Sequence, residues 1–254
     1  MSTEKKVTRV EGGSQASPPK TFAPTPESKS KANQLRLFAG LSWLLAIAAQ
    51  IVAILMLFKT PINMVLIIGL IVIDLAFAIL GSILWKKSNR LDPASEKNKF
   101  MFFMQSQLGL VVAIIAFLPL VIFIFTSKNL DGKQKGIIGG IAVVALLIAG
   151  ITGIDFNPPS VEQYTQQAFE VEQLTGQNLV YWTKSGSRYH IDMGCHSINT
   201  GRTDEIFEGT VARARELKNI SELCGHCRNR AMREKNLTAE DLIMPEETEI
   251  GGTE

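Results

Sequence analysis

Four long stretches with almost no charged residue occupy the middle of the chain and restrict what it can fold into. A helix that crosses the apolar core of a bilayer, about 30 Å thick, needs about 20 apolar residues, because no water is present there to satisfy its backbone. Buried helices of soluble proteins are shorter and carry a polar face. We therefore exclude a single water-soluble globule and predict an α-helical membrane protein with four transmembrane helices within residues 36–154. The predicted spans are residues 37–58, 62–85, 106–126 and 136–154.

The composition of the chain removes two further classes of protein. Its net charge is +2, which is too small for a protein whose main role is to wrap nucleic acid. The chain contains three cysteines, and all of them follow residue 190. A small secreted domain held together by a scaffold of disulfides is therefore excluded as well.

Lysine and arginine residues near the spans predict their orientation, because positively charged connections tend to stay in the cytoplasm. One side carries nine such residues: Lys20, Lys29, Lys31, Arg36, Lys86, Lys87, Arg90, Lys97 and Lys99. The opposite side carries four: Lys59, Lys128, Lys133 and Lys135. We therefore expect a multi-pass protein of the cell (plasma) membrane with both termini in the cytoplasm.

A few residues inside the spans are candidates for more than lipid contact. Asp74 lies near the middle of the second span, where a carboxylate costs several kcal/mol unless it is neutral or paired. We keep two interpretations of Asp74 open, a functional intramembrane group and a protonated or hydrogen-bonded residue that helps to assemble the bundle. Gln50 and Pro119 are weaker signals of the same kind. Gly136 and Gly140 form a G-x-x-x-G pattern that predicts close helix packing, either within the chain or in a homo-oligomer.

The polar segments around the spans have distinct compositions. Residues 1–35 are rich in Ser, Thr, Pro and Lys and hold almost no apolar residue, so we predict a disordered cytoplasmic segment. Residues 155–177 are predicted to be a linker with a short amphipathic helix, which starts after Ser160 and stops at Gly176 and lies on the membrane or on the next domain. Residues 237–254 hold six acidic residues and no basic one, which predicts an acidic disordered tail.

The segment between these parts, residues 178–236, is predicted to form a small α+β zinc-binding domain on the C-terminal side of the membrane region. The expected elements are strands at residues 179–183 and 187–190, joined by a turn, and helices at residues 210–218, with Thr210 as N-cap, and 228–235. A domain of about 60 residues has little core of its own, so a bound metal would supply much of its folding free energy.

Two pairs of metal ligands, a His-x4-Cys and a Cys-x2-Cys, occur in this domain and are separated by 28 residues. Two pairs on separate turns are what a closed tetrahedral zinc site requires. The predicted ligands of one structural zinc ion per chain are His190, Cys195, Cys224 and Cys227. His196 and His226 compete for the fourth position. We favour His190 because it ends a strand, whereas His226 points away if both flanking cysteines bind the metal.

Other uses of the cysteines fit the sequence less well. A disulfide between Cys224 and Cys227 would leave Cys195 without a partner and would need an oxidising compartment. A thioredoxin-like redox pair belongs to a βαβ unit, which the sequence does not indicate. An iron–sulfur cluster usually has four cysteine ligands.

The residues around the ligands form a longer pattern. It reads Tyr181-x-Thr183-x-x-Gly186-x-x-Tyr189-His190-x4-Cys195, then Gly209-Thr210 with Ala212 and Ala214, then Leu223-Cys224-x2-Cys227. This pattern, over about a quarter of the chain, resembles a small bacterial module that is attached to membrane proteins and to some secreted nucleases. It is similar in outline to the metal-binding N-terminal domain of the Ada DNA-repair protein. The resemblance implies a zinc-ligand role for the same four residues, but not methyl-acceptor chemistry, because the Ada domain uses four cysteines.

No catalytic constellation accompanies the ligands, and four protein ligands leave no open position on the metal, so we do not expect an enzyme. Arg228, Arg230 and Arg233 could contact phosphates or a partner, although we favour a solvated helix face as their explanation. Our first hypothesis is an integral membrane protein with a cytoplasmic zinc module that has an interaction or regulatory role and contacts an unknown protein partner. The alternatives are a small transporter or channel gated by the module, with Asp74 on its path, and a membrane-tethered nucleic-acid-binding protein, although nucleic acid is not the expected partner.

Overall fold

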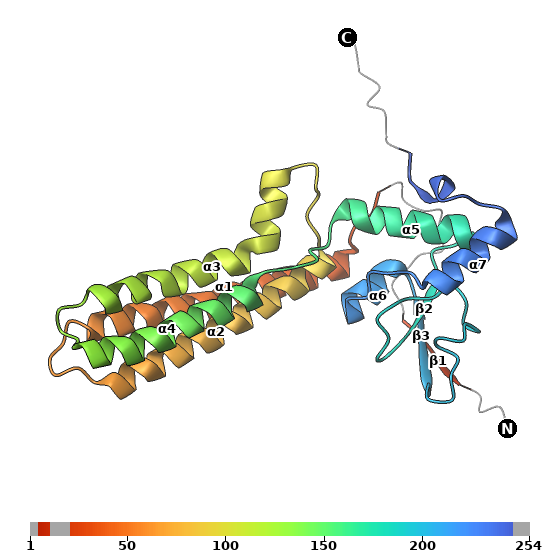
Figure 1. Ribbon diagram of the computed structural model, residues 1–254. Helices are drawn as coiled ribbons and strands as arrows, with labels where there is room; N and C mark the ends of the chain where they lie inside the picture. The colour runs from red at the N-terminus through yellow and green to blue at the C-terminus, as the bar shows by residue number, and fades with distance from the viewer. Residues whose placement is uncertain (1–4, 11–20, 246–254) are drawn as a thin grey trace, which may run out of the picture. The chain divides into compact units, whose positions relative to one another are not determined.

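The structure is a computed structural model that describes residues 5–10 and 21–245 (Figure 1). The described chain is mostly helical and contains a three-stranded sheet. It divides into two compact units. We call Pro24–Ser160 the helical bundle, and we call the unit that combines Met1–Ala23 with Val161–Glu254 the module.

Four long helices lie side by side in the helical bundle (Figure 1). They are α1 (Pro26–Met56), α2 (Met64–Leu91), α3 (Lys99–Thr126) and α4 (Gly132–Gly153). Each is long and apolar enough to cross a membrane, in agreement with the four predicted spans. Large apolar side chains remain on the outside of the bundle, where Leu44, Val65 and Ile151 are 64%, 81% and 61% exposed. An outer surface of this kind is typical of helices surrounded by lipid.

The first helix begins well before the first predicted span. The Thr25 side chain accepts a hydrogen bond from the backbone N–H of Ser28 at 3.1 Å, and Pro26 occupies the first turn, where its missing N–H costs nothing. The prediction of disorder over residues 1–35 is therefore wrong for its last ten residues. A strong N-cap and the apolar helix that follows outweigh the polar composition of this segment.

Glycines allow two helices of the bundle to meet at their backbones. A Cβ atom added to Gly109 in α3 would lie 2.8 Å from the carbonyl oxygen of Gly153 in α4, and one added to Gly153 would lie 2.7 Å from the carbonyl of Gly109. Around Gly136 and Gly140, by contrast, an added Cβ atom meets nothing within 4 Å. The helical bundle therefore does not use the predicted G-x-x-x-G pair for its own packing, and contact between copies through this pair stays a prediction.

Gln50 and Pro119 both affect the hydrogen bonding of one backbone carbonyl, that of Ile115. Pro119 has no N–H, so the carbonyl of Ile115, four residues earlier in α3, lacks its normal helical donor. The side-chain amide of Gln50 in α1 donates a hydrogen bond to this oxygen at 3.2 Å. Since a carbonyl group in an apolar bundle needs a donor from the protein, this bond compensates for the proline.

The module contains a sheet with the strand order β1-β3-β2. Its strands are β1 (Lys6–Arg9), β2 (Val180–Thr183) and β3 (Glu205–Gly209). β2 is antiparallel to β3, and β1 is parallel to β3, with Lys6 opposite Glu205 and Arg9 opposite Glu208. The Thr8 hydroxyl donates to the Glu205 carboxylate at 2.5 Å. The predicted disorder of residues 1–35 is therefore also wrong at β1, because β3 offers this short polar segment an edge on which to pair.

Helices pack around this sheet and against one another. They are α5 (Val161–Thr175), α6 (Val211–Lys218), α7 (Gly225–Lys235) and the 3-10 helix η1 (Glu240–Leu242). The predicted amphipathic helix is α5, which ends before Gly176 at a φ of 85°. It buries Tyr164, Val171 and Leu174 in the module, so of the two predicted placements the one on the next domain is observed, and residues 161–175 belong to that folded unit and not to a separate linker.

Two other boundaries differ from the sequence-based expectation. The predicted strand at residues 187–190 is reduced to isolated bridges, one of which joins His190 to Tyr181. The predicted disordered tail is folded in its first part, because Leu242 is buried and its carbonyl accepts a hydrogen bond from the side chain of Gln166 at 2.7 Å. The predicted disorder of residues 246–254 lies outside the described residues.

Candidate metal centre

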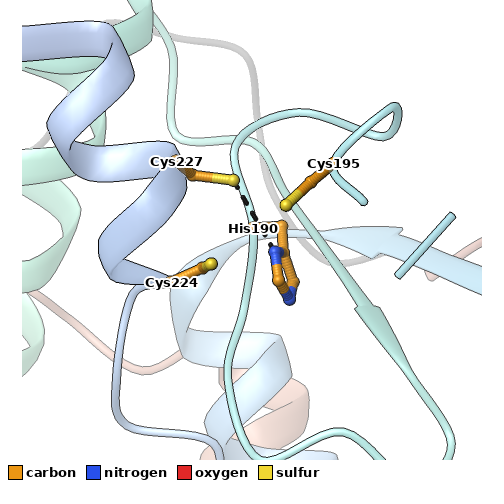
Figure 2. Close-up of side chains that lie close together, drawn as sticks. All are labelled: His190, Cys195, Cys224 and Cys227. Atoms are coloured by element: carbon orange, nitrogen blue, oxygen red, sulfur yellow. Dashed lines mark hydrogen bonds between the residues drawn. The ribbon is translucent and has the colours of Figure 1, made fainter. Parts of the chain in front are cut away.

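Four side chains from two separate segments of the module point towards a common centre (Figure 2). They are the four ligands predicted from the sequence: His190, Cys195, Cys224 and Cys227. One nitrogen or sulfur atom from each lies within 4.8 Å of the others, and all four residues are buried. The cluster could therefore hold a metal ion.

The size of the cluster fits a tetrahedral ion. With metal–sulfur bonds of about 2.3 Å and a metal–nitrogen bond of about 2.0 Å, the edges of the tetrahedron are about 3.8 Å between sulfurs and about 3.5 Å between sulfur and nitrogen. The His190 Nδ1 atom and the Cys227 Sγ atom are 3.6 Å apart. The other edges are at most 4.8 Å long, so a contraction of no more than about 1 Å would bring all four atoms to bonding distance of one ion.

Backbone hydrogen bonds place His190 between β2 and the start of α7. His190 and Tyr181 exchange two backbone hydrogen bonds, each of 2.7 Å. The carbonyl of Tyr189, one residue earlier, accepts a bond from the N–H of Cys224 at 2.9 Å. The strand that presents the histidine is therefore joined directly to the turn that presents the first cysteine of the Cys-x2-Cys pair.

Cys195 lies in a tight turn that Asp192 organises. The Asp192 carboxylate accepts a hydrogen bond from the N–H of Gly194 at 2.8 Å, and its carbonyl accepts one from Cys195 at 3.1 Å. The same carboxylate forms an ion pair with Arg230 on α7. Asp192 thus fastens the turn of one ligand to the helix that carries another. The sequence analysis did not identify Asp192, although Asp-x-Gly is a known turn signal.

The first turn of α7 sets the electrostatics of the two other thiols. Cys224 is the N-cap residue and Cys227 lies in the first turn. Burial acts to raise the pKa of the Cys224 thiol, but hydrogen bonds from the backbone of Cys227 and His226 outweigh it, and the pKa of Cys224 lies below its usual value. Burial raises the pKa of Cys227. A bound cation would favour the thiolate form of both residues.

His190 is the histidine of the cluster, and its environment favours the form that binds metals. Burial, together with the nearby His196 and Arg188, lowers the pKa of His190, so its ring is neutral at pH 7 and keeps a lone pair. His196 and His226, the two predicted competitors, are exposed. Their rings pack edge to face with centroids 4.5 Å apart and are not part of the four-residue cluster.

The basic residues after the last ligand have mainly internal contacts. Arg228 forms an ion pair with Glu170 of α5 at 2.5 Å, and Arg230 pairs with Asp192. Arg233 is exposed. Two of the three predicted phosphate or partner contacts therefore hold the module together, and the set is not a free cationic cluster.

Asp74, the predicted intramembrane candidate, lies in the helical bundle and takes no part in the metal cluster. Its side chain is fully buried, and neither carboxylate oxygen has a hydrogen-bond partner in the part of the chain that the structure describes. The interhelical hydrogen bond that one of the two interpretations expects is therefore not observed.

The pattern that resembles the bacterial zinc module surrounds the metal cluster, and its residues have visible structural roles. The N–H of Gly186 closes the turn on the carbonyl of Thr183 at 3.3 Å. Gly209 leaves room for the ring of Trp182, which a Cβ atom at this position would meet at 2.9 Å. No protein-family model matches the chain, and neither curated proteins nor solved structures give a match.

Proposed function

We propose that the chain is an integral protein of the cell membrane and that its module holds one structural zinc ion on the cytoplasmic side. On that side, the module binds or regulates a protein partner and does not catalyse a reaction. The observation that carries this proposal is the closed set of four buried ligands, His190, Cys195, Cys224 and Cys227. Four protein ligands complete a tetrahedral shell, whereas a catalytic zinc keeps one position for water or substrate.

The chemistry of the ligand set supports zinc over other metals. Magnesium and calcium prefer oxygen ligands, and iron–sulfur clusters usually take four cysteines. Three thiolates and one imidazole in a tetrahedral arrangement are a common structural zinc site. Because the apolar core of the module is small, the metal would supply a large part of its folding free energy.

The pairing of β1 with β3 supports the placement of both termini on one side of the membrane. β1 precedes the four long helices and β3 follows them, yet the two strands are paired over four residues. Strands can pair only in the same compartment, and four crossings return the chain to its starting side. The excess of Lys and Arg, nine against four, favours the cytoplasm for that side.

Protease protection in sealed vesicles tests this topology. With one epitope tag at each terminus of the full-length protein, both tags are expected to be digested in inside-out vesicles and protected in right-side-out vesicles. Digestion of only one tag in either preparation would contradict four crossings. Protection of both tags in inside-out vesicles would contradict the cytoplasmic placement.

Cross-linking in the native membrane tests the role of the module. A partner bound through the module is expected to cross-link to the wild-type protein and to His226→Ala, which alters an exposed histidine outside the cluster. The cross-link is expected to disappear in Cys227→Ser, which removes one ligand. The non-catalytic role would be wrong if the purified protein turned over a substrate in a zinc-dependent way and Cys227→Ser abolished turnover while the protein stayed folded.

A further inference from the structure

Asp74 is a titratable residue of the helical bundle that the proposed function leaves without a role. It is 0% exposed and lies on the inward face of α2. With a rise of about 1.5 Å per residue, it is about 15 Å from Met64 and about 16 Å from Trp85 along the helix. Asp74 therefore lies near the middle of the apolar length of α2.

Asp74 is buried on the same face of α2 as residues of the apolar core of the bundle. Its nearest inward neighbours on α2 are Ile71 and Ala78. The buried core contributed by the other three helices includes small apolar residues, among them Ala46, Ala53, Ala113, Ala116, Ala142 and Ala145. Among the other buried polar side chains of the bundle, Gln50 donates to the carbonyl of Ile115 and Ser82 to that of Ala78, whereas the Nε1 atom of Trp43 in α1 has no partner within the described residues. Neither carboxylate oxygen of Asp74 has a hydrogen-bond partner within the described residues.

Neither an ion pair nor a bound metal explains such a carboxyl group. Asp74 is the one ionisable residue within the apolar stretches of the sequence, and the nearest ionisable residues that border these stretches are Arg36, Lys59, Lys86, Lys99, Lys128, Lys135 and Asp155. A metal cation needs several oxygen ligands, and no second acidic side chain occurs in these stretches. A carboxylate without donors or counter-charge is strongly disfavoured in an apolar interior. The proton is the cation that neutralises a lone carboxylate without further ligands.

We propose that Asp74 is a proton-binding site in the middle of the helical bundle, which holds one proton while the helices are packed and exchanges it when the bundle opens to water. This inference rests on the membrane embedding in the proposed function and is independent of the zinc site. It assigns to the bundle a conformational change that is linked to the uptake or release of a proton.

A carbodiimide reports directly on a protonated carboxyl group. The proton of the acid moves to a nitrogen of the reagent, and the carboxyl oxygen bonds to the central carbon. The acyl group then migrates to nitrogen and leaves a stable N-acylurea, with no leaving group and no change of oxidation state. A lipophilic reagent such as dicyclohexylcarbodiimide reaches the interior of a bilayer, whereas a charged, water-soluble carbodiimide does not.

The experiment uses the full-length protein in liposomes, with the adduct located by mass spectrometry of its peptides. Above the midpoint of titration, labelling of Asp74 by the lipophilic reagent is expected to fall about tenfold for each pH unit, because each unit removes about nine-tenths of the remaining acid form. Asp74→Glu should be labelled in the same way and Asp74→Asn should show no adduct at this position. Asp92 and Asp155, at the ends of the bundle, serve as internal controls for carboxyl groups outside its apolar interior.

Two results would overturn the proton site. Absence of an adduct on Asp74 in folded protein would show that the residue does not carry a proton. A yield that stays constant over the whole pH range would show a permanently neutral structural acid that exchanges nothing. Equal labelling by the water-soluble reagent would instead contradict the membrane embedding, and the zinc content of the same sample reports separately on the module.

Discussion

Replacement of Gln50 by leucine is expected to destabilise the helical bundle through one backbone carbonyl. The Gln50 side chain donates to the oxygen of Ile115 at 3.2 Å, and Pro119 cannot provide the normal helical donor. An unsatisfied buried acceptor costs about 1–3 kcal/mol in soluble proteins. Side-chain hydrogen bonds between membrane helices contribute less, about 0.6 kcal/mol on average and at most about 1.7 kcal/mol. We therefore expect Gln50→Leu to lower the free energy of unfolding by about 0.6–1.7 kcal/mol through this bond.

A double-mutant cycle separates this effect from the change in side-chain packing. Pro119→Ala restores an N–H that can donate to the carbonyl of Ile115, so Gln50→Leu should cost less in that background, with a coupling energy of about 0.6–1.7 kcal/mol. Unfolding of the four proteins in mixed detergent micelles, followed by tryptophan fluorescence, measures the coupling. Effects that add to within about 0.3 kcal/mol would refute the proposed compensation.

Three further predictions concern the packing of α4, the docking of β1 and the metal. Gly153→Ala is expected to lower the free energy of unfolding by about 1–3 kcal/mol, because a Cβ atom there lies 2.7 Å from the backbone of α3. Gly140→Ala, which meets nothing within 4 Å, is its control in detergent unfolding, and equal losses would contradict this packing. The hydrogen bond from Thr8 lowers the pKa of Glu205, with help from Lys6, so the ionised carboxylate stabilises docked β1 above the usual pKa of 4.5. That contribution is lost as the pH falls through the lowered pKa of Glu205. Hydrogen exchange of the β1 amides should therefore be faster in Glu205→Gln than in wild type at neutral pH. In acid, where the wild-type carboxylate is protonated, the two proteins should exchange at the same rate. Removal of the metal with a chelator is expected to unfold the module while the helical bundle keeps its helix content by circular dichroism, and an unchanged module would contradict a structural metal.

The parts of the fold that the sequence predicts are those determined by local composition. The four long helices follow from apolar length alone, because a membrane span must satisfy its backbone within a single helix. The start of α1 also had a local signal, Thr25 followed by Pro26, which the polar composition of the segment concealed. β1 had none, because Lys6–Arg9 becomes a strand only by pairing with β3, which follows almost two hundred residues later.

The candidate site shows the same contrast between features set by local sequence and features set by contacts between distant segments. Cys-x2-Cys and His-x4-Cys bring ligands together over a few residues, so their spacing was enough to predict the cluster. The contacts that support it join distant segments, as in the pairs of Asp192 with Arg230 and of Glu170 with Arg228. Without these partners, the two arginines resembled a free basic helix face, and their structural role became visible only in the folded module.

The metal content of the purified full-length protein tests the central claim most directly. Elemental analysis of wild type and three variants is the measurement, with His226→Ala as the matched control for His190→Ala. We predict one zinc ion per chain in wild type and in His226→Ala, and loss of zinc in His190→Ala and Cys227→Ser. A folded wild-type protein without zinc, or equal loss of zinc from the two histidine variants, would contradict the assignment of this centre.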